Sequence, residues 1–546
     1  MTRRTFRLLP LALALACAAP RPPPPAEPQK AAPAQATQQT QAAPQPPPGP
    51  DRSRPPELGP APELELPAQK HFTLANGLKV RLVERHRLPI VALHLVVDAG
   101  GIHDPPKLPG LASFTAAMLT EGGTRTRSAT RISDDVGFLG ASLSSGATQD
   151  SAFVSGASLS RHVPKLLEIF ADVAMNPAFP RKDFLRVQDQ RKVTLLQQRD
   201  QPQTVATKAF TNVFWGSGSP YAHYVLGTEA SVAATRPEDL SRYHARLWRP
   251  DGAELVVVGD VTEAALRPVL ERTLGKWKKG GPSPVPRQGP LAAPHRTVLI
   301  EKADAPQSAL LLGMPGVERA SKDYVPATVL FQVLGGGTSS RLFRNLREEK
   351  GYTYGLGAGA DARRLAGVSV VRGNVKADVT GPALKEILAE LDRLRKEPVA
   401  DEELADAKAA LVRSLPADFA TVGGVAGRIA ELVVYGLPDD YWNGYADAVK
   451  KVTAEDVRRV ADRVLDPARA TLVLVGTPEV VSPQLAALPI GPVEVRPPPG
   501  EPPGKKGPAA PRPPMPARAP GPTPPPAAMP PPAMHPGAAP TAPAGH

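Results

Sequence analysis

The sequence is poor in cysteine and in clustered charge, and both shortages limit what the chain can be. Cys17 is the only cysteine among 546 residues, so no disulfide can form within the chain. No run of five or more Lys or Arg residues occurs, although the formal net charge is +12. Basic and acidic residues alternate through the central part, which is typical of a solvated surface and argues against a nucleic-acid partner.

Proline, in contrast, is abundant. The chain has 68 prolines, many of them packed into two stretches, from Ala18 to about Pro67 and from about Gly491 to His546. These stretches contain few large apolar side chains and cannot bury enough surface to offset the entropy lost on ordering, so we expect disordered arms. The remainder, about His71 to Leu488, is long enough for two cores of roughly 200 residues each.

Residues 1–16 have the pattern of a signal peptide. Met1 to Arg7 is basic, and the apolar run Leu8 to Ala16 is too short to span a bilayer in the mature protein. The segment Ala14-Leu15-Ala16-Cys17 resembles a bacterial lipobox, whose cysteine is diacylated and becomes the mature N-terminus. We therefore expect an exported, periplasmic lipoprotein that is anchored to a membrane through Cys17. The alternatives are an ordinary signal peptide with an incidental cysteine, or a twin-arginine export signal at residues 2–6.

A repeat runs through the central part of the chain. Pro237 and Ala454 each lie at the start of a helical stretch that leads into a Val/Leu-rich run ending in Gly. Pro89 and Pro306 each precede an apolar run with the character of a strand. Both pairs are displaced by 217 residues, and one offset at both ends of the unit indicates a duplicated domain.

We predict an α+β fold in which each copy is a mostly antiparallel sheet covered by helices. Short Val/Leu-rich runs bounded by Gly or Pro are typical of strands, and residues 166–174 and 383–394 have the spacing of amphipathic helices. Strands and helices are mixed and do not alternate strictly, so this fold is preferred over a doubly wound parallel sheet. The expected organisation is a signal peptide at 1–16, a Pro-rich tether at 17–66, an N-terminal domain at 67–279, a linker at 280–296, a C-terminal domain at 297–488 and a disordered tail at 489–546.

The first copy carries a characteristic order of motifs. Phe72 to Val80 contains Asn-Gly between two apolar runs, which is a hairpin signal. Gly100-Gly101-Ile102-His103-Asp104 comes after a strand, and Pro-Gly-Leu-Ala begins at Pro109. This order resembles the insulinase/pitrilysin family of zinc metallopeptidases, and the resemblance covers nearly all of the central part. In that family an inverted zinc motif, His-x-x-Glu-His, follows Gly-Leu-Ala, and a Glu in a later helix completes the metal site.

None of the zinc ligands that the resemblance implies is present in this chain. Hydroxyl groups and alanines are poor substitutes for imidazole and carboxylate ligands. The five motif positions hold Ser113, Phe114, Thr115, Ala116 and Ala117. The helix expected to supply the Glu, at residues 191–199, contains no Glu. We therefore expect no metal and no cofactor on this chain, with the degenerate positions at Ser113, Ala116 and Ala117.

The histidines offer no replacement site. The ten histidines are scattered, and no two lie three to five residues apart with a Glu between them. His103 is the one nearest to the lost motif, and alone it supplies at most one bond to a metal. His223 lies in a loop-like Gly-Ser-Pro-Tyr region and is interpreted as a surface or packing residue.

The second copy retains the other half of the family pattern. Residues 341–350 are predicted to form a helix with a Ser or Thr cap at its start and Gly351 as a left-handed cap after its end. Tyr352 and Tyr354 are expected on one face of a strand that follows directly. The resemblance implies that Arg347 and Tyr354 are the family's substrate-binding pair, which hydrogen-bonds a backbone carbonyl of the bound peptide. The alternative is a solvated helix-end Arg and a packed strand Tyr.

What is lost and what is kept together indicate a function. We interpret the chain as the non-catalytic, substrate-binding subunit of a heterodimeric zinc metallopeptidase that acts on peptides or unfolded proteins, inactive alone, with zinc on a partner subunit of the same family. Residues 137–143 match a family hairpin whose edge strand pairs with the peptide, or they form an ordinary strand. One alternative function is a structural or binding module of this fold, resembling the core proteins of a mitochondrial respiratory complex. A second alternative is an active peptidase with an unconventional metal site.

Overall fold

The structure is a computed structural model, and it describes residues 59, 66, 68–281, 286 and 295–498. The predicted signal peptide, Cys17, most of the predicted tether and the chain after residue 498 lie outside the described residues. All strands and helices below belong to one compact unit, Ala61–His546. Among the described residues, no helix is both long and apolar enough to cross a membrane.

The first sheet has six strands in the order β1-β2-β6-β3-β5-β4. Four neighbouring pairs are antiparallel, and β2 pairs with β6 in parallel. The strands are β1 (Lys70–Thr73), β2 (Lys79–Glu84), β3 (Ile90–Val97), β4 (Ser142–Ala147), β5 (Ala152–Leu159) and β6 (Ala253–Gly259). The turn between β1 and β2 contains Asn76 and Gly77 as predicted, and Gly77 has a φ of 89°, where a side chain would be strained.

The second sheet also has six strands, in the order β12-β7-β11-β8-β10-β9. Its pairs β12–β7 and β7–β11 are parallel and the other three are antiparallel. The strands are β7 (Arg296–Glu301), β8 (Gln307–Pro315), β9 (Gly355–Ala362), β10 (Gly367–Lys376), β11 (Thr471–Gly476) and β12 (Val493–Arg496). The two sheets are therefore mixed and mostly antiparallel, which confirms the predicted fold class.

The α-helices fall into two groups, one in the part of the sequence that forms each sheet. The first group is α1 (Leu111–Glu121), α2 (Ala129–Phe138), α3 (Val163–Met175), α4 (Arg181–Gln197), α5 (Pro202–Trp215), α6 (Glu229–Ala234), α7 (Pro237–Leu247) and α8 (Glu263–Arg272). The second group is α9 (Tyr324–Gly335), α10 (Arg341–Phe343), α11 (Thr380–Lys396), α12 (Asp401–Asp418), α13 (Val422–Tyr435), α14 (Tyr441–Lys451), α15 (Ala454–Val464) and α16 (Pro478–Leu485).

The repeat read from the sequence is a repeat of structure. Strands β3 and β8 begin at Ile90 and Gln307, and helices α7 and α15 begin at Pro237 and Ala454, each pair 217 residues apart. Helices α3 and α11 start with the same displacement. Local chemistry explains the shared boundaries: Pro237 lies in the first turn of α7, and Thr453 caps α15 by accepting a hydrogen bond from the Asp456 amide, 3.1 Å.

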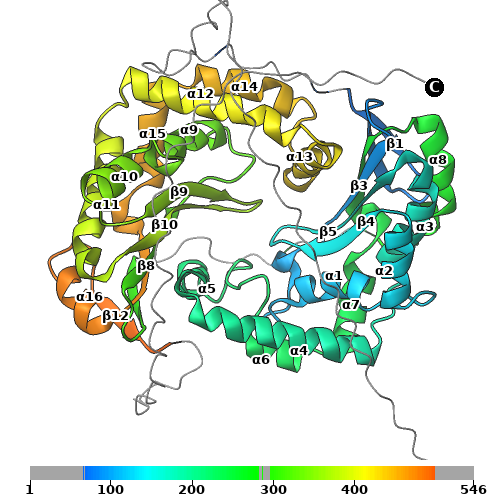
Figure 1. Cartoon of the computed structure of the whole chain (residues 1–546), viewed down its shortest axis with the longest axis horizontal. Coiled ribbons are helices and arrows are strands. Elements are labelled where there is room, and N and C mark those ends of the chain that lie inside the picture. Colours follow the sequence, from blue (N-terminus) through cyan, green and yellow to red (C-terminus); the bar gives the residue numbers. More distant parts are fainter. Residues whose placement is uncertain (1–58, 60–65, 67, 282–285, 287–294, 499–546) are drawn as a thin grey trace, which may run out of the picture. The chain divides into compact units, whose positions relative to one another are not determined.

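Each sheet is covered on one face by its own repeat and on the other face by a helix of the other repeat. Leu93 and Leu95 of β3 pack into the core formed with α1 and α3, whereas Ala92 and Val96 on the opposite face pack into a core with α13. Figure 1 shows α13 on one side of the first sheet and α3 on the other. In the second sheet, Leu311 and its neighbours pack against aromatic residues of α5. The α5 residues in this core include Phe210, Phe214 and Trp215.

A loop of the second repeat also fastens the two repeats together. Arg364, between β9 and β10, donates to Asp98 Oδ1 at 2.8 Å and to the Asp150 carbonyl at 2.8 Å, and its own amide donates to Asp150 Oδ2 at 3.1 Å. The Tyr221 hydroxyl donates to Asp150 Oδ1 at 2.6 Å and accepts from the Leu365 amide at 3.2 Å. We call Asp98, Asp150, Tyr221 and Arg364 the inter-repeat latch.

Two local predictions are wrong, and a third holds only for its last two residues. The strand after Gly351 begins only at Gly355, so Tyr352 and Tyr354 do not share a strand face: Tyr352 packs against the core and Tyr354 is exposed. Ser340 stands at the N-cap position, but its hydroxyl donates to the Gly337 carbonyl and does not cap the helix. Residues 137–143 are the end of α2, a turn and the start of edge strand β4; the hairpin there is β4–β5.

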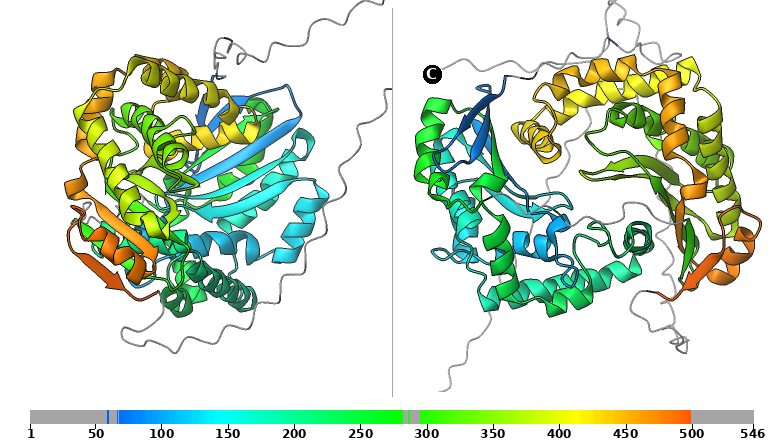
Figure 2. Two further views of the ribbon diagram at one scale, coloured as in Figure 1. Left: turned by 60° about the vertical axis from the view of Figure 1, so that its left-hand side comes forward. Right: turned by 180° about the vertical axis from the view of Figure 1, so that it is seen from behind.

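The second sheet also extends beyond residue 488, where the disordered tail was predicted to begin. Ile490 is buried, and its carbonyl accepts a hydrogen bond from the Thr297 hydroxyl at 2.6 Å. Strand β12 then pairs with β7 at the edge of the sheet. It is labelled in Figure 1 and is the red-orange strand in the two views of Figure 2. This strand was missed because it has only two apolar residues, Val493 and Val495, and many prolines follow it in the sequence.

Candidate functional site

Helix α1 carries the five positions where the resemblance places a zinc motif. Asp104 accepts hydrogen bonds from the amides of Gly110 (2.6 Å) and Ala112 (2.7 Å), so a carboxylate stabilises the positive end of the helix. Four of the five motif residues, from Ser113 to Ala116, are buried. The helix is thus held as a core element and exposes little of the former motif.

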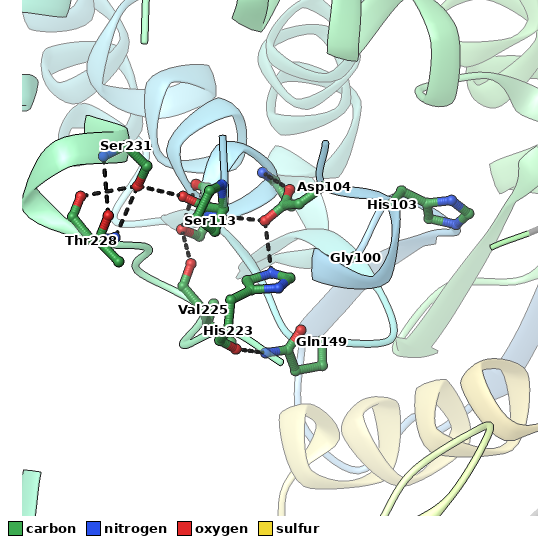
Figure 3. A network of polar contacts seen from close by, with 12 residues as sticks. Gly100, His103, Asp104, Ser113, Gln149, His223, Val225, Thr228 and Ser231 are labelled. Carbon is green, nitrogen blue, oxygen red and sulfur yellow. Dashed lines mark hydrogen bonds and ion pairs between the residues drawn. The ribbon is translucent and has the colours of Figure 1, made fainter. Parts of the chain in front are cut away.

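The hydroxyl and the carbonyl of Ser113, the first motif position, are both hydrogen-bonded within the protein. Its hydroxyl donates to the Val225 carbonyl at 2.6 Å (Figure 3). Arg191 of α4 donates to the Ser113 hydroxyl at 3.1 Å and to its carbonyl at 2.6 Å, and the guanidinium lies 4.7 Å from the centre of the Phe114 ring. Burial lowers the pKa of Arg191 to about 10, although the charges of Glu121 and Asp104 oppose the shift.

These residues do not fit a zinc ion. Ser113, Ala116 and Ala117 supply no imidazole or carboxylate, and α4 contains no Glu. Arg191 adds a permanent positive charge beside Ser113, which would repel a second cation. Within the described part of the chain, no group of three or more His, Cys, Asp or Glu residues could hold a metal.

The two histidines near this helix each have a carboxylate partner. His223 Nε2 lies 3.0 Å from Asp104 Oδ2, and the Gln149 side-chain amide donates to the His223 carbonyl at 2.6 Å (Figure 3). His103 points away from this network and lies 3.2 Å from Asp98 of the inter-repeat latch. The structure therefore separates the two histidines, and each of them contacts a different carboxylate.

Arg347 and Tyr354, predicted from the second repeat, lie in contact. The Arg347 guanidinium carbon is 4.4 Å from the centre of the Tyr354 ring and 4.6 Å from that of Phe343. Tyr354 is 82% exposed. Among the described residues, neither side chain has a hydrogen-bonding or ion-pair partner, so the guanidinium and phenol donors are oriented by stacking and remain free.

The segment that carries Arg347 has an unusual backbone. Residues Arg344–Glu349 form a π-helix, a rare conformation that is found frequently at functional sites. Neighbouring side chains hold it in place: Asn345 donates to Glu390 of α11 at 3.0 Å, and Arg341 forms two bonds with Glu403 of α12, at 2.7 and 2.8 Å. Gly351 ends the segment in the left-handed conformation, as predicted.

Strand β9, which follows Tyr354 directly, has one bare face. Leu356, Ala358 and Ala360 pack against the core, whereas Gly355, Gly357 and Gly359 alternate on the other face. A Cβ built on Gly355 or Gly359 would meet no atom within 4 Å. Because β9 is also the edge of its sheet, its outer backbone groups have no strand partner among the described residues.

Sequence reasoning found the residue pair but missed what surrounds both regions. The contact between Arg191 and Ser113 joins positions 78 residues apart, and no local pattern indicates it. Residues 341–350 were predicted as one ordinary helix, and the π-helix within them was missed. The alternating glycines of β9 were a readable signal, because glycine on one face of an edge strand marks a close approach of another chain or a ligand.

Comparison with known proteins agrees with the fold and the motifs. Residues 79–225 match the family described as insulinase (peptidase family M16), and residues 235–411 match the domain described as peptidase M16 inactive domain. An uncharacterised zinc protease of Bacillus subtilis is 24% identical over 348 residues, which cover 63% of this chain and 83% of that protein. The mitochondrial-processing peptidase subunit alpha of Solanum tuberosum is 24% identical over 426 residues, covering 74% and 82%.

Solved structures show the same architecture. The crystal structure of a peptidase M16 inactive domain from Pseudomonas fluorescens superposes with a TM-score of 0.70 at 26% identity, over 75% of this chain and 98% of that one. A protease from Helicobacter pylori gives a TM-score of 0.70 at 20% identity and supports the fold alone. The fold and motifs define a peptidase-like protein of two related domains. The chain belongs to the insulinase (M16) peptidase family.

Proposed function

We propose that this chain is the non-catalytic, substrate-binding subunit of a heterodimeric zinc metallopeptidase that acts on peptides or unfolded proteins. The observation that carries this proposal is the pairing of Arg347 with Tyr354, two donors in contact and without hydrogen-bond partners among the described residues. In the same chain, helix α1, where the family binds zinc, carries no zinc-ligating side chain at the motif positions, and Arg191 bonds to Ser113 there. Peptide-binding donors are kept and metal ligands are not.

The chemistry of the pair suits a peptide carbonyl. An Arg fork is always charged and presents fixed N–H donors, and a Tyr hydroxyl adds a directional O–H donor, so both can orient a carbonyl without attacking it. The bare face and free edge of β9 begin one residue after Tyr354 and offer backbone groups to an extended peptide. A substrate held by Arg347 and Tyr354 would therefore find a strand edge beside it.

The partner in this proposal is a zinc-bearing subunit of the same family. One relative of this chain is by name a subunit of a processing peptidase, which supports a division of labour between chains. The metal chemistry would reside on the partner, and this chain would bind and orient the substrate. We infer from the sequence alone that the chain is exported to the periplasm and lipid-anchored at Cys17.

The test uses the full chain together with a family subunit that carries an intact His-x-x-Glu-His motif and comes from the same genome. The isolated chain is expected to contain no stoichiometric zinc and to leave a fluorescein-labelled, unfolded casein intact. The mixture should cleave it, and Arg347→Ala should lower kcat/KM by about tenfold or more, the usual effect of losing a hydrogen bond from a charged donor.

Arg344→Ala is the matched control, because Arg344 lies one turn earlier on the same π-helix, is exposed and pairs at 3.5 Å with Glu403. It should leave kcat/KM unchanged. Chelator-sensitive cleavage by the isolated chain would contradict the proposal and indicate an active enzyme. Equal activity of the Arg347→Ala and wild-type mixtures would instead indicate a structural subunit with no role in substrate binding.

A further inference from the structure

A pocket of about 260 Å³ lies in the first repeat, apart from the Arg347–Tyr354 pair. Its walls include four prolines, Pro105, Pro106, Pro109 and Pro220, and one turn of α5 faces it with Lys208 and Asn212. Proline fixes its own backbone angle, so these walls are rigid and the pocket is formed before any ligand arrives. Its volume is just below the usual range for drug-sized ligands, which favours a fragment of about one residue in size.

The acidic group in this pocket is enclosed by hydrogen-bond partners. The Asp104 side chain accepts hydrogen bonds from the amides of Gly110 and Ala112, and its Oδ2 lies 3.0 Å from His223 Nε2. Only 1% of this carboxylate side chain is exposed. The Asp104 oxygens are therefore engaged by protein groups and almost wholly covered from a ligand that enters the pocket.

The basic group in the pocket is not neutralised. Lys208 is half-buried, its Nζ lies 5.4 Å from the centre of the Tyr224 ring, and no carboxylate of the described residues is within ion-pair distance of it. Glu229, whose charge acts on Lys208, is itself engaged by Arg199 through two hydrogen bonds, at 2.6 and 2.8 Å. Burial lowers the pKa of Lys208, as expected for a cation that lacks a counter-ion.

We propose that this pocket binds a carboxylate attached to a small apolar group, with the carboxylate on Lys208 and Asn212 and the apolar group between the prolines and Tyr224. One cation matches one negative charge, and the largely apolar walls disfavour a doubly charged phosphate, which needs more donors. The two sources of this chemistry are the C-terminal residue of a peptide and a free carboxylic acid. The site is independent of the proposed subunit function.

The test measures binding of N-acetyl-leucine to the full chain by isothermal titration, with N-acetyl-leucinamide as the uncharged analogue. The amide should bind at least about tenfold more weakly, because it lacks the charge that pairs with Lys208. Lys208→Met, which removes the charge and keeps the length of the side chain, should weaken binding of the acid by a similar factor. Lys192→Met on α4 is the control and should bind the acid like wild type, since Lys192 is outside the pocket and pairs with Asp189 at 3.0 Å.

Equal binding of acid and amide, or unchanged binding by a folded Lys208→Met variant, would overturn the proposal. Circular dichroism establishes that each variant is folded. A tetrapeptide that ends in leucine, tested with a free and with an amidated C-terminus, identifies the source of the carboxylate. If the tetrapeptide binds with its free C-terminus but not when amidated, the ligand is a peptide terminus. If N-acetyl-leucine binds and neither tetrapeptide does, the ligand is a free carboxylic acid. Arg347→Ala should leave all of these affinities unchanged, which separates this site from the proposed peptide contact.

Discussion

The two regions that the family resemblance singles out, one in each repeat, have opposite hydrogen-bonding states. Around Ser113, the hydroxyl, the carbonyl and the incoming Arg191 satisfy one another inside the protein. Around Arg347, the guanidinium and the Tyr354 phenol are stacked, and within the described residues their donors are unused. In a duplicated fold, one site can thus be converted into core while the other stays open to a ligand, without any change in the strand order of either sheet.

The largest expected effect is on the free energy of unfolding, which should differ between substitutions in the two regions. Arg191→Ala should lower the free energy of unfolding by about 3 kcal/mol, because two charge-assisted hydrogen bonds and a contact with the Phe114 ring are lost in a part-buried place. Arg347→Ala should cost about 1 kcal/mol or less, because two ring contacts are removed and no hydrogen bond of the described residues is lost. Urea unfolding of both variants makes the measurement.

Arg181→Ala is the control for this experiment, since Arg181 is exposed at the start of the same helix as Arg191. It should change the free energy of unfolding by no more than about 0.5 kcal/mol. If the Arg191 and Arg347 variants lose equal stability, the contrast between a closed and an open region is wrong.

A smaller effect concerns the latch that joins the two regions in one body. Burial alone would raise the pKa of Asp98, but the hydrogen bond from His103 and the charge and hydrogen bond of Arg364 outweigh it and hold the pKa below its ordinary value of 3.8. A carboxyl whose pKa is lowered on folding adds stability above its unfolded pKa and loses it as the pH falls through the folded pKa. The latch should therefore weaken below about pH 4.

The measurement compares wild type with Asp98→Asn in urea at pH 5 and pH 3. Wild type should be the more stable protein at pH 5, and the difference between the two should shrink at pH 3, because the unfolded wild-type chain binds a proton at Asp98 more readily than the folded protein does. A difference that stays constant between the two pH values would show that Asp98 does not act through its charge.

The smallest effect tests whether the face of β9 is as open as its glycines indicate. Gly359→Val should change the free energy of unfolding by less than about 1 kcal/mol, because the new side chain meets open space and suits a strand. Ala358→Val, one residue away on the covered face, should cost about 1–3 kcal/mol by overpacking. Equal destabilisation by the two variants in a thermal melt would mean that the glycine face is covered.

The sequence predicted the parts of the fold that depend on local patterns. Pro89 and Pro306 mark the starts of β3 and β8, Asn76 and Gly77 form the first turn, and residues 166–174 lie within α3. These features follow from backbone chemistry and side-chain spacing over a few residues. Because the two repeats are offset by 217 residues, an element predicted in the first repeat also predicts its counterpart in the second.

The parts that were missed depend on contacts between distant segments. Phe210 and Trp215 of α5 could be read as buried, but nothing local specifies that they pack against the sheet of the other repeat. Tyr354 precedes the strand in which it was expected because the Tyr352 carbonyl accepts from the Lys376 amide and Thr353 bonds to the Asn374 carbonyl, which ends the pairing differently. At the candidate sites, the predicted pair Arg347 and Tyr354 is in contact, whereas the contact of Arg191 with Ser113 had no local signal in the sequence.

The reciprocal packing of α5 and α13 has a consequence for how the molecule can come apart. Each sheet borrows the cover of its second face from the other repeat, so neither half can complete its core alone. Removing one repeat would strip Val96 and Val256 on one side, or Leu311 and Val473 on the other, of their helical cover. Proteolytic halves should consequently bind each other tightly, and the intact chain should melt in a single transition instead of one repeat at a time.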